Sequence, residues 1–344
     1  MPFALPQRSL RAIGEVLTRL ATVKPKEVKM TIGLDVGSTS VKVVVLGSRK
    51  GTAARPLLAH TIVPLVEEEE TDASETIKTA MGMLQVPVRS VNIGVSGQWV
   101  IMRVVEMPAL KPAEMKQALP FEAQRFLPFN IEDVVIDGEV LGPAEDNKMW
   151  VLIVACKKEL IERRMDWTKR AGLSVSLIDV DALALANAFL DARNGQGTEG
   201  TSAVVNVGAQ LTNLVILKQG VAYQVRDIPW GADKLSRKVA EQTGADVAVV
   251  SEQLTKGEAA PEFLNAVKVA TEVLVTEVQL SFDYFENRFG QPPDEVLISG
   301  GLSQSRLFVE AFKSHVTQRV DAWSPMSELP GQFTIAYGLA LRSA

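Results

Sequence analysis

Short apolar runs alternate with helix-like segments from Thr31 onward. Apolar runs bounded by polar or turn residues are typical of buried strands, and they occur at VNIGVSG, VLIVAC, SLIDV, AVVNVG, NLVIL and EVLISGG. Several are separated by segments with apolar residues at three- and four-residue steps, such as KKELIERRMDWTKRAG. This alternation predicts an α/β protein.

The longest helical pattern covers residues 264–289. Its apolar residues, which include Phe282 and Phe285, recur at helical spacing, and Gly290 follows as an end signal. The pattern predicts one long helix whose aromatic side chains lie in a hydrophobic core.

Two sixteen-residue blocks repeat one pattern. TIGLDVGSTSVKVVVL and SAVVNVGAQLTNLVIL each contain an apolar run, a turn with glycine and a second apolar run. Asp35 in the first block falls on Asn206 in the second, and Gly37 falls on Gly208. A repeated hairpin predicts two similar half-domains whose glycine turns face each other across a ligand.

The first turn has the chemistry of a phosphate-binding loop. Its backbone N–H groups and the hydroxyl groups of Ser38, Thr39 and Ser40 can converge on an anion, with Lys42 as a counter-charge. Asp35, at the end of the preceding strand, can hold a magnesium ion through water.

A third glycine turn, Gly300-Gly301, follows the apolar run EVLIS and opens a helical pattern. Glycine lets the backbone approach a phosphate or a flat ligand closely. This turn is therefore a candidate to cover a nucleoside.

These blocks resemble the motifs of the actin-like ATPase superfamily. The hairpins are similar to its two phosphate motifs, EVLISGGL to its adenosine motif, and DVDALALANAFL and FTIAYGLALR to its connecting helices. The resemblance implies two RNase H-like halves with ATP and Mg²⁺ between them. The residues it implies for the nucleotide are Gly37, Ser38, Thr39, Ser40, Lys42, Gly208, Thr212, Gly231, Lys234, Glu252, Lys256, Gly300, Gly301 and Ser303.

A narrower resemblance covers the region between the first phosphate motif and the first connecting helix. VSGQWVIMRVVEMPALKPAEMKQALPFEAQRFLPFNIEDVVID and VLIVACKKELIERRMDWTKRAGL are similar to the PilM family of type IV pilus assembly proteins. That family has an inserted subdomain, IC, placed as in FtsA. The implied subdomains are IA (31–97, 177–200 and 321–344), IC (98–176), IIA (201–232 and 296–320) and IIB (233–295), after an N-terminal extension (1–30).

The PilM resemblance implies a cytosolic ATP-binding adaptor of the pilus inner-membrane complex. Such proteins hold the N-terminal peptide of the membrane protein PilN in a groove between IA and IC, and pilus motor ATPases are further candidate partners. Phe121, Phe126 and Phe129 are candidates for this groove. The alternative is that these phenylalanines form the core of IC.

Asn206 departs from the superfamily pattern, which generally has Asp in the second phosphate motif to order magnesium and the attacking water. An amide can still form hydrogen bonds, but it carries no charge and cannot accept a proton as a base. Asp35 and Asn206 are thus the candidate metal ligands and, with Asp179, the candidate catalytic residues. We expect ATP hydrolysis to be slow or absent.

Some of these assignments have plain structural alternatives. Asp179 could be confused with its neighbour Asp181, and either carboxylate could cap the helix that begins at Ala182. Glu252 and Lys256 could be ordinary surface charges on an exposed helix.

Composition narrows the choice of partners and compartment. Lys and Arg number 36 against 41 Asp and Glu, a net charge of −5 that argues against nucleic acid. The single cysteine, Cys156, excludes an intramolecular disulfide and lies in an apolar run typical of a core thiol. We expect a cytoplasmic protein because no apolar run is long enough to span a membrane.

Residues 1–30 form a basic amphipathic pattern with apolar residues at helical spacing. A helix packed on its own domain and a peripheral contact with anionic lipid both fit this pattern.

Other functions stay open at this point. A type II secretion scaffold of the GspL kind shares the implied architecture, and so does a filament-forming relative of FtsA or actin. A small-molecule kinase of the superfamily would need a carboxylate base beside a sugar pocket, and no residue is a convincing candidate.

Overall fold

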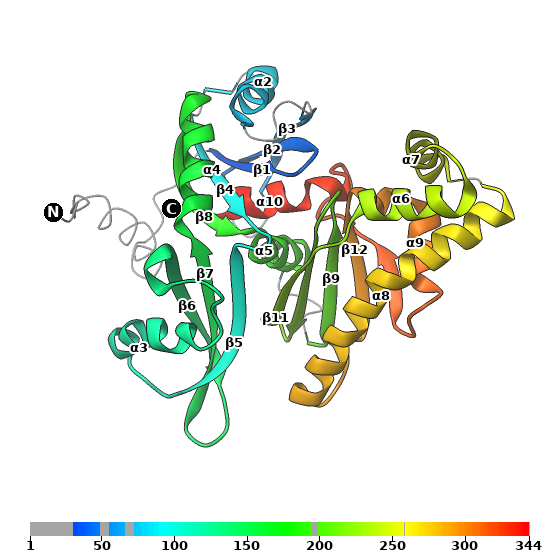
Figure 1. Cartoon of the computed structure of the whole chain (residues 1–344). Coiled ribbons are helices and arrows are strands. Elements are labelled where there is room, and N and C mark those ends of the chain that lie inside the picture. The colour runs from blue at the N-terminus through cyan, green and yellow to red at the C-terminus, as the bar shows by residue number, and fades with distance from the viewer. Residues whose placement is uncertain are drawn as a thin grey trace.

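The computed structural model describes residues 30–48, 55–65, 72–84, 86–87, 89–194, 199–257 and 259–343. Apart from Met30, the basic amphipathic segment expected in residues 1–30 lies outside the described residues. The described residues form two five-stranded sheets and one three-stranded sheet, with helices packed on them (Figure 1).

The two five-stranded sheets have the same strand order. The first contains β3 (Leu57–Pro64), β2 (Ser40–Gly47), β1 (Met30–Val36), β4 (Ser90–Val95) and β8 (Ser174–Val180). The second contains β11 (Val221–Ile228), β10 (Thr212–Lys218), β9 (Thr201–Val207), β12 (Glu295–Gly300) and β13 (Arg319–Ala322). In each sheet three strands form an antiparallel meander and two run parallel to its first strand. The predicted duplication is confirmed.

The repeated hairpins pair in the same register. Asp35 lies opposite Lys42 in the first hairpin, and Asn206 lies opposite Asn213 in the second. Because side chains alternate along a strand, these two pairs occupy equivalent positions beside the two glycine turns.

The inserted subdomain follows β4 and contains the three-stranded sheet. Its elements are β5 (Val100–Pro108), α3 (Pro112–Gln124), the short helix Ile131–Asp133, β6 (Val134–Pro143) and β7 (Lys148–Lys157). The strand order β5-β7-β6 makes β6 an edge strand. Helix α4 (Lys158–Arg170) then returns the chain to β8, which begins at Ser174, whereas the sequence predicts the return to subdomain IA at residue 177. Similarly, β13 crosses the predicted boundary between residues 320 and 321.

The insert also contacts the second half of the molecule. The Trp150 ring of β7 lies 6.4 Å from the Tyr223 ring and 5.3 Å from the Phe289 ring, between centroids. Arg288 covers Trp150 at 4.4 Å and donates a hydrogen bond to the Val104 carbonyl of β5. The insert, which belongs to the first half in sequence, therefore also packs against the second half.

Two helices connect the halves at the centre of the molecule, α5 (Asp181–Arg193) and α10 (Thr334–Leu341) (Figure 1). They cross where Gly338 meets Ala184: a Cβ atom at Gly338 would lie 1.8 Å from the Ala184 carbonyl oxygen. A Cβ atom at Gly33 of β1 would likewise lie 1.9 Å from the Ala336 carbonyl oxygen. Glycine at these positions permits the close packing of α10.

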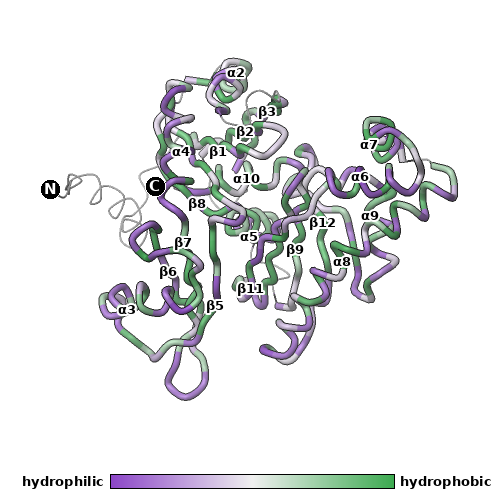
Figure 2. Tube along the Cα trace, in the orientation of Figure 1, coloured by the Kyte–Doolittle hydropathy of each residue, from purple (hydrophilic) through white to green (hydrophobic). Residues whose placement is uncertain are grey.

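The remaining helices pack on the outer sides of the sheets. They are α2 (Ser74–Leu84), α6 (Ala232–Thr243), α7 (Val247–Lys256), α8 (Pro261–Phe289) and α9 (Arg306–Lys313), and short helices cover Gly301–Gln304 and Gly331–Phe333. Helix α8 ends at Gly290, whose φ is 86°, and it buries Phe282 and Phe285 completely, as the sequence predicts. Figure 2 shows the hydrophobic strands surrounded by more polar helices.

Candidate functional site

The first glycine turn joins β1 to β2. The Gly37 N–H donates to the Ser40 carbonyl at 3.0 Å, which closes the turn. Ser38 and Thr39 are exposed, whereas Ser40 is buried. The Lys42 ammonium lies 3.2 Å from the Asp35 carboxylate, so these two predicted residues form an ion pair at the base of the turn.

The second glycine turn has the same closure, with the Gly208 N–H donating to the Leu211 carbonyl at 2.9 Å. Helix α6 begins directly against it, and a Cβ atom at Gly231 would lie 2.4 Å from the Ala209 carbonyl oxygen. Thr212 is completely buried and donates to the Trp230 carbonyl at 2.8 Å, so its hydroxyl supports the strand end.

The third glycine turn packs on the second. Gly300 has a φ of 83°, and a Cβ atom there would lie 2.4 Å from the carbonyl oxygen of Val207, next to Gly208. The Ser303 hydroxyl donates to the Gly300 carbonyl at 2.7 Å and holds the turn. The fold therefore brings the adenosine-like turn and the second phosphate-like turn together.

Three predicted nucleotide residues lie on exposed helix surfaces. Lys234, near the start of α6, donates to the Pro229 carbonyl, and Glu252 and Lys256 on α7 form an exposed ion pair at 2.7 Å. These contacts fit the interpretation of Glu252 and Lys256 as surface charges.

A chain of polar side chains lies behind the second turn. Asn213 donates to the Asp227 carboxylate at 2.7 Å, and Asn206 donates to the Asn213 carbonyl oxygen at 3.2 Å. Asp227 also accepts a hydrogen bond from the Gly97 N–H at 2.7 Å, which links the two halves. The carboxylate orients both amides, and the buried Asn206 Oδ1 is left without a hydrogen-bond partner.

Asn213 and Asp227 are site residues that the sequence reasoning missed. The sequence signal that could have identified Asn213 is its position in the repeated hairpin, where it corresponds to Lys42. The strand register then places Asn213 opposite Asp227 on β11.

Asp181, rather than Asp179, lies near Asp35. Burial, together with the charges of Asp35 and Asp227, raises the pKa of Asp181 to about 7, and Ser96 and Arg164 oppose the shift. A Cβ atom at Gly94 would lie 1.9 Å from the Asp181 Oδ1, so glycine there makes room for the carboxylate.

Asp179 lies in a different environment. It is 8% exposed, its Oδ1 accepts from the Val180 N–H at 2.8 Å, and its Oδ2 lies 3.4 Å from the Arg342 Nε. Burial raises the pKa of Asp179, and the charge of Arg342 and the Val180 N–H oppose that shift. Neither Asp179 nor Asp181 caps α5 through its side chain. The position of Asp179 favours a role in the cavity described below, and a catalytic role for it stays a prediction.

We expect the Asp181 carboxylate to make the stability of the protein depend on pH. Its ordinary pKa of 3.8 is raised to about 7 by folding, so its contribution to stability is complete below pH 3.8 and is lost as the pH rises through 7. Asp181→Asn stays neutral, and it should therefore exceed the wild type in unfolding free energy by about 4 kcal/mol at pH 8 and by little at pH 4. Urea unfolding across this range measures the difference. The exposed Asp133→Asn serves as the control, and a pH-independent difference for Asp181→Asn would contradict the prediction.

The side chains beside the two glycine turns fit a water-coordinated magnesium ion. Within the described residues, no three His, Cys, Asp or Glu side chains are close enough to bind a metal directly. Asp35 and the unpartnered Asn206 Oδ1 instead lie at equivalent strand ends. Magnesium keeps several of its waters and needs few protein ligands.

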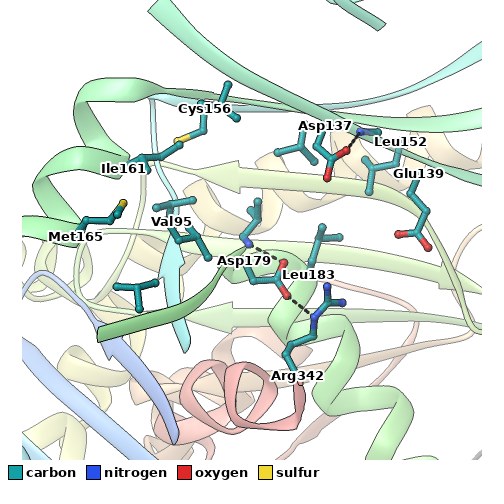
Figure 3. A pocket seen from close by; sticks show the side chains of 16 residues that line it. Val95, Asp137, Glu139, Leu152, Cys156, Ile161, Met165, Asp179, Leu183 and Arg342 are labelled. Atoms are coloured by element: carbon teal, nitrogen blue, oxygen red, sulfur yellow. Dashed lines mark hydrogen bonds and ion pairs between the residues drawn. The ribbon is translucent and has the colours of Figure 1, made fainter. Parts of the chain in front are cut away.

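A cavity of about 270 Å³ lies between the inserted subdomain and the first half (Figure 3). One wall is a sheet surface in which Val135, Asp137 and Glu139 of β6 pair with Cys156, Val154 and Leu152 of β7. The opposite wall is made by residues of β8, α5 and the end of the chain, including Ile178, Asp179, Leu183 and Arg342. Ile161 and Met165 of α4 close one end.

The candidate groove phenylalanines lie elsewhere in the insert. Phe121 is 74% exposed on α3, Phe126 packs against the core of the insert, and Phe129 lies under the Lys157 ammonium at 4.7 Å. None of the three lines the cavity. Cys156 does line it, and burial raises the pKa of this thiol to about 12, in keeping with the predicted core thiol.

The sequence matches the model of one protein family. Residues 33–344 match the family described as type IV pilus assembly protein PilM. Among solved structures, the chain is similar to a PilM–PilN type IV pilus biogenesis complex, with a TM-score of 0.80 and 23% identity over 92% of this chain and 98% of that chain.

More distant structures share the fold. A Bacteroides thetaiotaomicron protein with an actin-like ATPase fold has a TM-score of 0.51 and 10% identity, over 94% of this chain and 100% of that chain. The cytoplasmic domain of EpsL, an inner membrane component of the Vibrio cholerae type II secretion system, has a TM-score of 0.50 and 13% identity, over 92% and 96%. The predicted actin-like ATPase fold is confirmed. In the described residues, no helix is both long enough and apolar enough to cross a membrane.

Proposed function

This chain belongs to the PilM family of type IV pilus assembly proteins, and we propose that it is a nucleotide-binding adaptor that holds a membrane protein of the PilN kind. It acts in the cytoplasm and is retained at the inner membrane by that partner. An interaction with pilus motor ATPases stays a prediction.

The cavity between the insert and the first half is the observation that supports this function best. Its walls are mainly apolar, and it lies beside two edge strands, β6 and β8. An extended peptide can be gripped at such a place by main-chain hydrogen bonds and by pockets for its side chains. A similar solved structure is a PilM–PilN complex. We assign the cavity to the cytosolic N-terminal peptide of the PilN-like protein.

The nucleotide lies between the two hairpin turns in this proposal. Ser38, Thr39 and Lys42 approach the phosphate groups, and the Gly300 turn covers the nucleoside. Asp35 and the Asn206 Oδ1 would hold magnesium through water, and the bound ion would neutralise phosphate charge.

We expect ATP turnover below about 1 per second with magnesium, under the ordinary enzyme range. Asn206 has no negative charge, and its amide nitrogen already donates a hydrogen bond to Asn213. Release of inorganic phosphate from ATP by the purified chain measures the rate, and a faster turnover would contradict the prediction. An unchanged low rate in Asn206→Asp would show that another group limits hydrolysis.

Calorimetric titration of the purified chain with the N-terminal peptide of its PilN-like partner tests the proposed function. We expect saturable one-to-one binding, measured with and without ATP and magnesium. A scrambled peptide of the same composition is the control. No binding in either nucleotide condition would overturn the proposal.

A further inference from the structure

The cavity has one apolar end and one charged end. Cys156, Ile161 and Met165 lie toward the apolar end, and Asp137 and Glu139 lie toward the other (Figure 3). Among the residues that line the cavity, three are carboxylates and one, Arg342, is a cation. The charged end therefore carries an excess of negative charge.

Strand geometry produces the charged end. Asp137 and Glu139 are two residues apart on β6, so both side chains lie on the same surface of the sheet. Their cross-strand neighbours on β7 are Val154 and Leu152. A pair of carboxylates thus stands beside an apolar surface that could cover the stem of a long side chain.

These carboxylates have few partners. The Asp137 Oδ1 accepts from the Gly138 N–H at 2.9 Å, and burial raises the pKa of Asp137 although this hydrogen bond and the charge of Lys116 oppose the shift. Neither Asp137 nor Glu139 forms an ion pair with a side chain in the described part of the chain. The Asp179 Oδ2 across the cavity is buried and accepts no hydrogen bond, although it forms an ion pair with the Arg342 Nε at 3.4 Å.

Asp137 is partly buried and forms no ion pair with a side chain in the described part of the chain, which lowers stability, and a cationic ligand can supply that partner. Glu139 is exposed, and it adds a second negative charge beside Asp137. We infer that the Asp137 and Glu139 pair selects a peptide that carries a lysine or arginine side chain next to its apolar residues. The apolar end then binds neighbouring aliphatic side chains, and the charged end sets the position of the peptide along the groove. This inference rests on the proposed function.

A cycle of two peptides and two proteins tests the inference. The peptides are the N-terminal peptide of the PilN-like partner and the same peptide with every lysine and arginine replaced by glutamine. The proteins are the wild type and the double variant Asp137→Asn, Glu139→Gln. Asp133→Asn, an exposed carboxylate of the same subdomain outside the cavity, is the matched control.

We expect the neutral peptide to bind the wild type and Asp133→Asn about tenfold more weakly than the basic peptide. In the double variant the two peptides should bind with nearly equal affinity, and added salt should weaken only the binding of the basic peptide to proteins that keep both carboxylates.

Equal binding of the two peptides to the wild type would overturn the inference and leave the proposed function standing. If the neutral peptide bound more weakly than the basic peptide by the same factor in the wild type and in the double variant, the inference would also be overturned, because the peptide charge would then be recognised elsewhere. If neither peptide bound the wild type, the proposed function would fail and the inference with it.

Discussion

Gly338→Ala should lower the free energy of unfolding by about 3 kcal/mol or more, because the added methyl group has no space. Its carbon would lie 1.8 Å from the Ala184 carbonyl oxygen and 2.5 Å from the Ala184 carbonyl carbon. The obstacle is backbone, so no side chain can rotate away, and α5 and α10 must separate. Urea unfolding followed by circular dichroism measures the loss.

Gly82→Ala provides a matched control within a helix. Gly82 lies in α2, and a Cβ atom there would meet nothing within 4 Å. Because alanine favours helix by about 1 kcal/mol over glycine, this variant should be slightly more stable than the wild type. If both variants shifted stability in the same direction, the tight crossing of α5 and α10 would not be the cause.

Val154→Arg should weaken binding of the PilN-like peptide by about a hundredfold. Val154 lies in the middle of the β7 surface that lines the cavity. An arginine there fills the space of the peptide and places a charge against its apolar side chains. Calorimetric titration measures the affinity, and thermal unfolding shows whether the variant keeps the wild-type fold.

Val140→Arg is the matched control for this variant. Val140 is on the neighbouring strand β6, is 47% exposed and does not line the cavity. It adds the same charge to the same sheet, so peptide binding should stay within about threefold of the wild type. A folded Val154→Arg protein with wild-type affinity would rule out the cavity as the peptide site.

The fold could be predicted from the sequence where local patterns carry the information. The repeated hairpins and the long helix that ends at Gly290 depend on periodicity and on glycine, both of which are read along the chain. The glycines at 33 and 338 show the limit of this approach. Glycine is needed at these positions because another helix approaches the backbone closely, and only the three-dimensional structure gives that distance.

The candidate site was predicted in part. The three glycine turns and the Asp35–Lys42 pair were found because each sits at the end of a recognisable strand. Asp179 and Asp181 could not be told apart, because they lie two residues apart where β8 ends and α5 begins, and the sequence does not show which carboxylate lies near Asp35. The phenylalanines of the insert are large apolar side chains but do not line the cavity, whose walls are mainly aliphatic residues together with three carboxylates and Arg342.

The aromatic contact of Trp150 with Tyr223 and Phe289 has a mechanical consequence. One wall of the peptide cavity belongs to the insert, which leans on the second half, and the opposite wall belongs to the first half. A hinge motion that separates the halves must therefore either break this aromatic contact or move the insert with the second half, which would change the shape of the cavity. The surroundings of Trp150, one of the five tryptophans in the chain, would then change when the halves move apart or together.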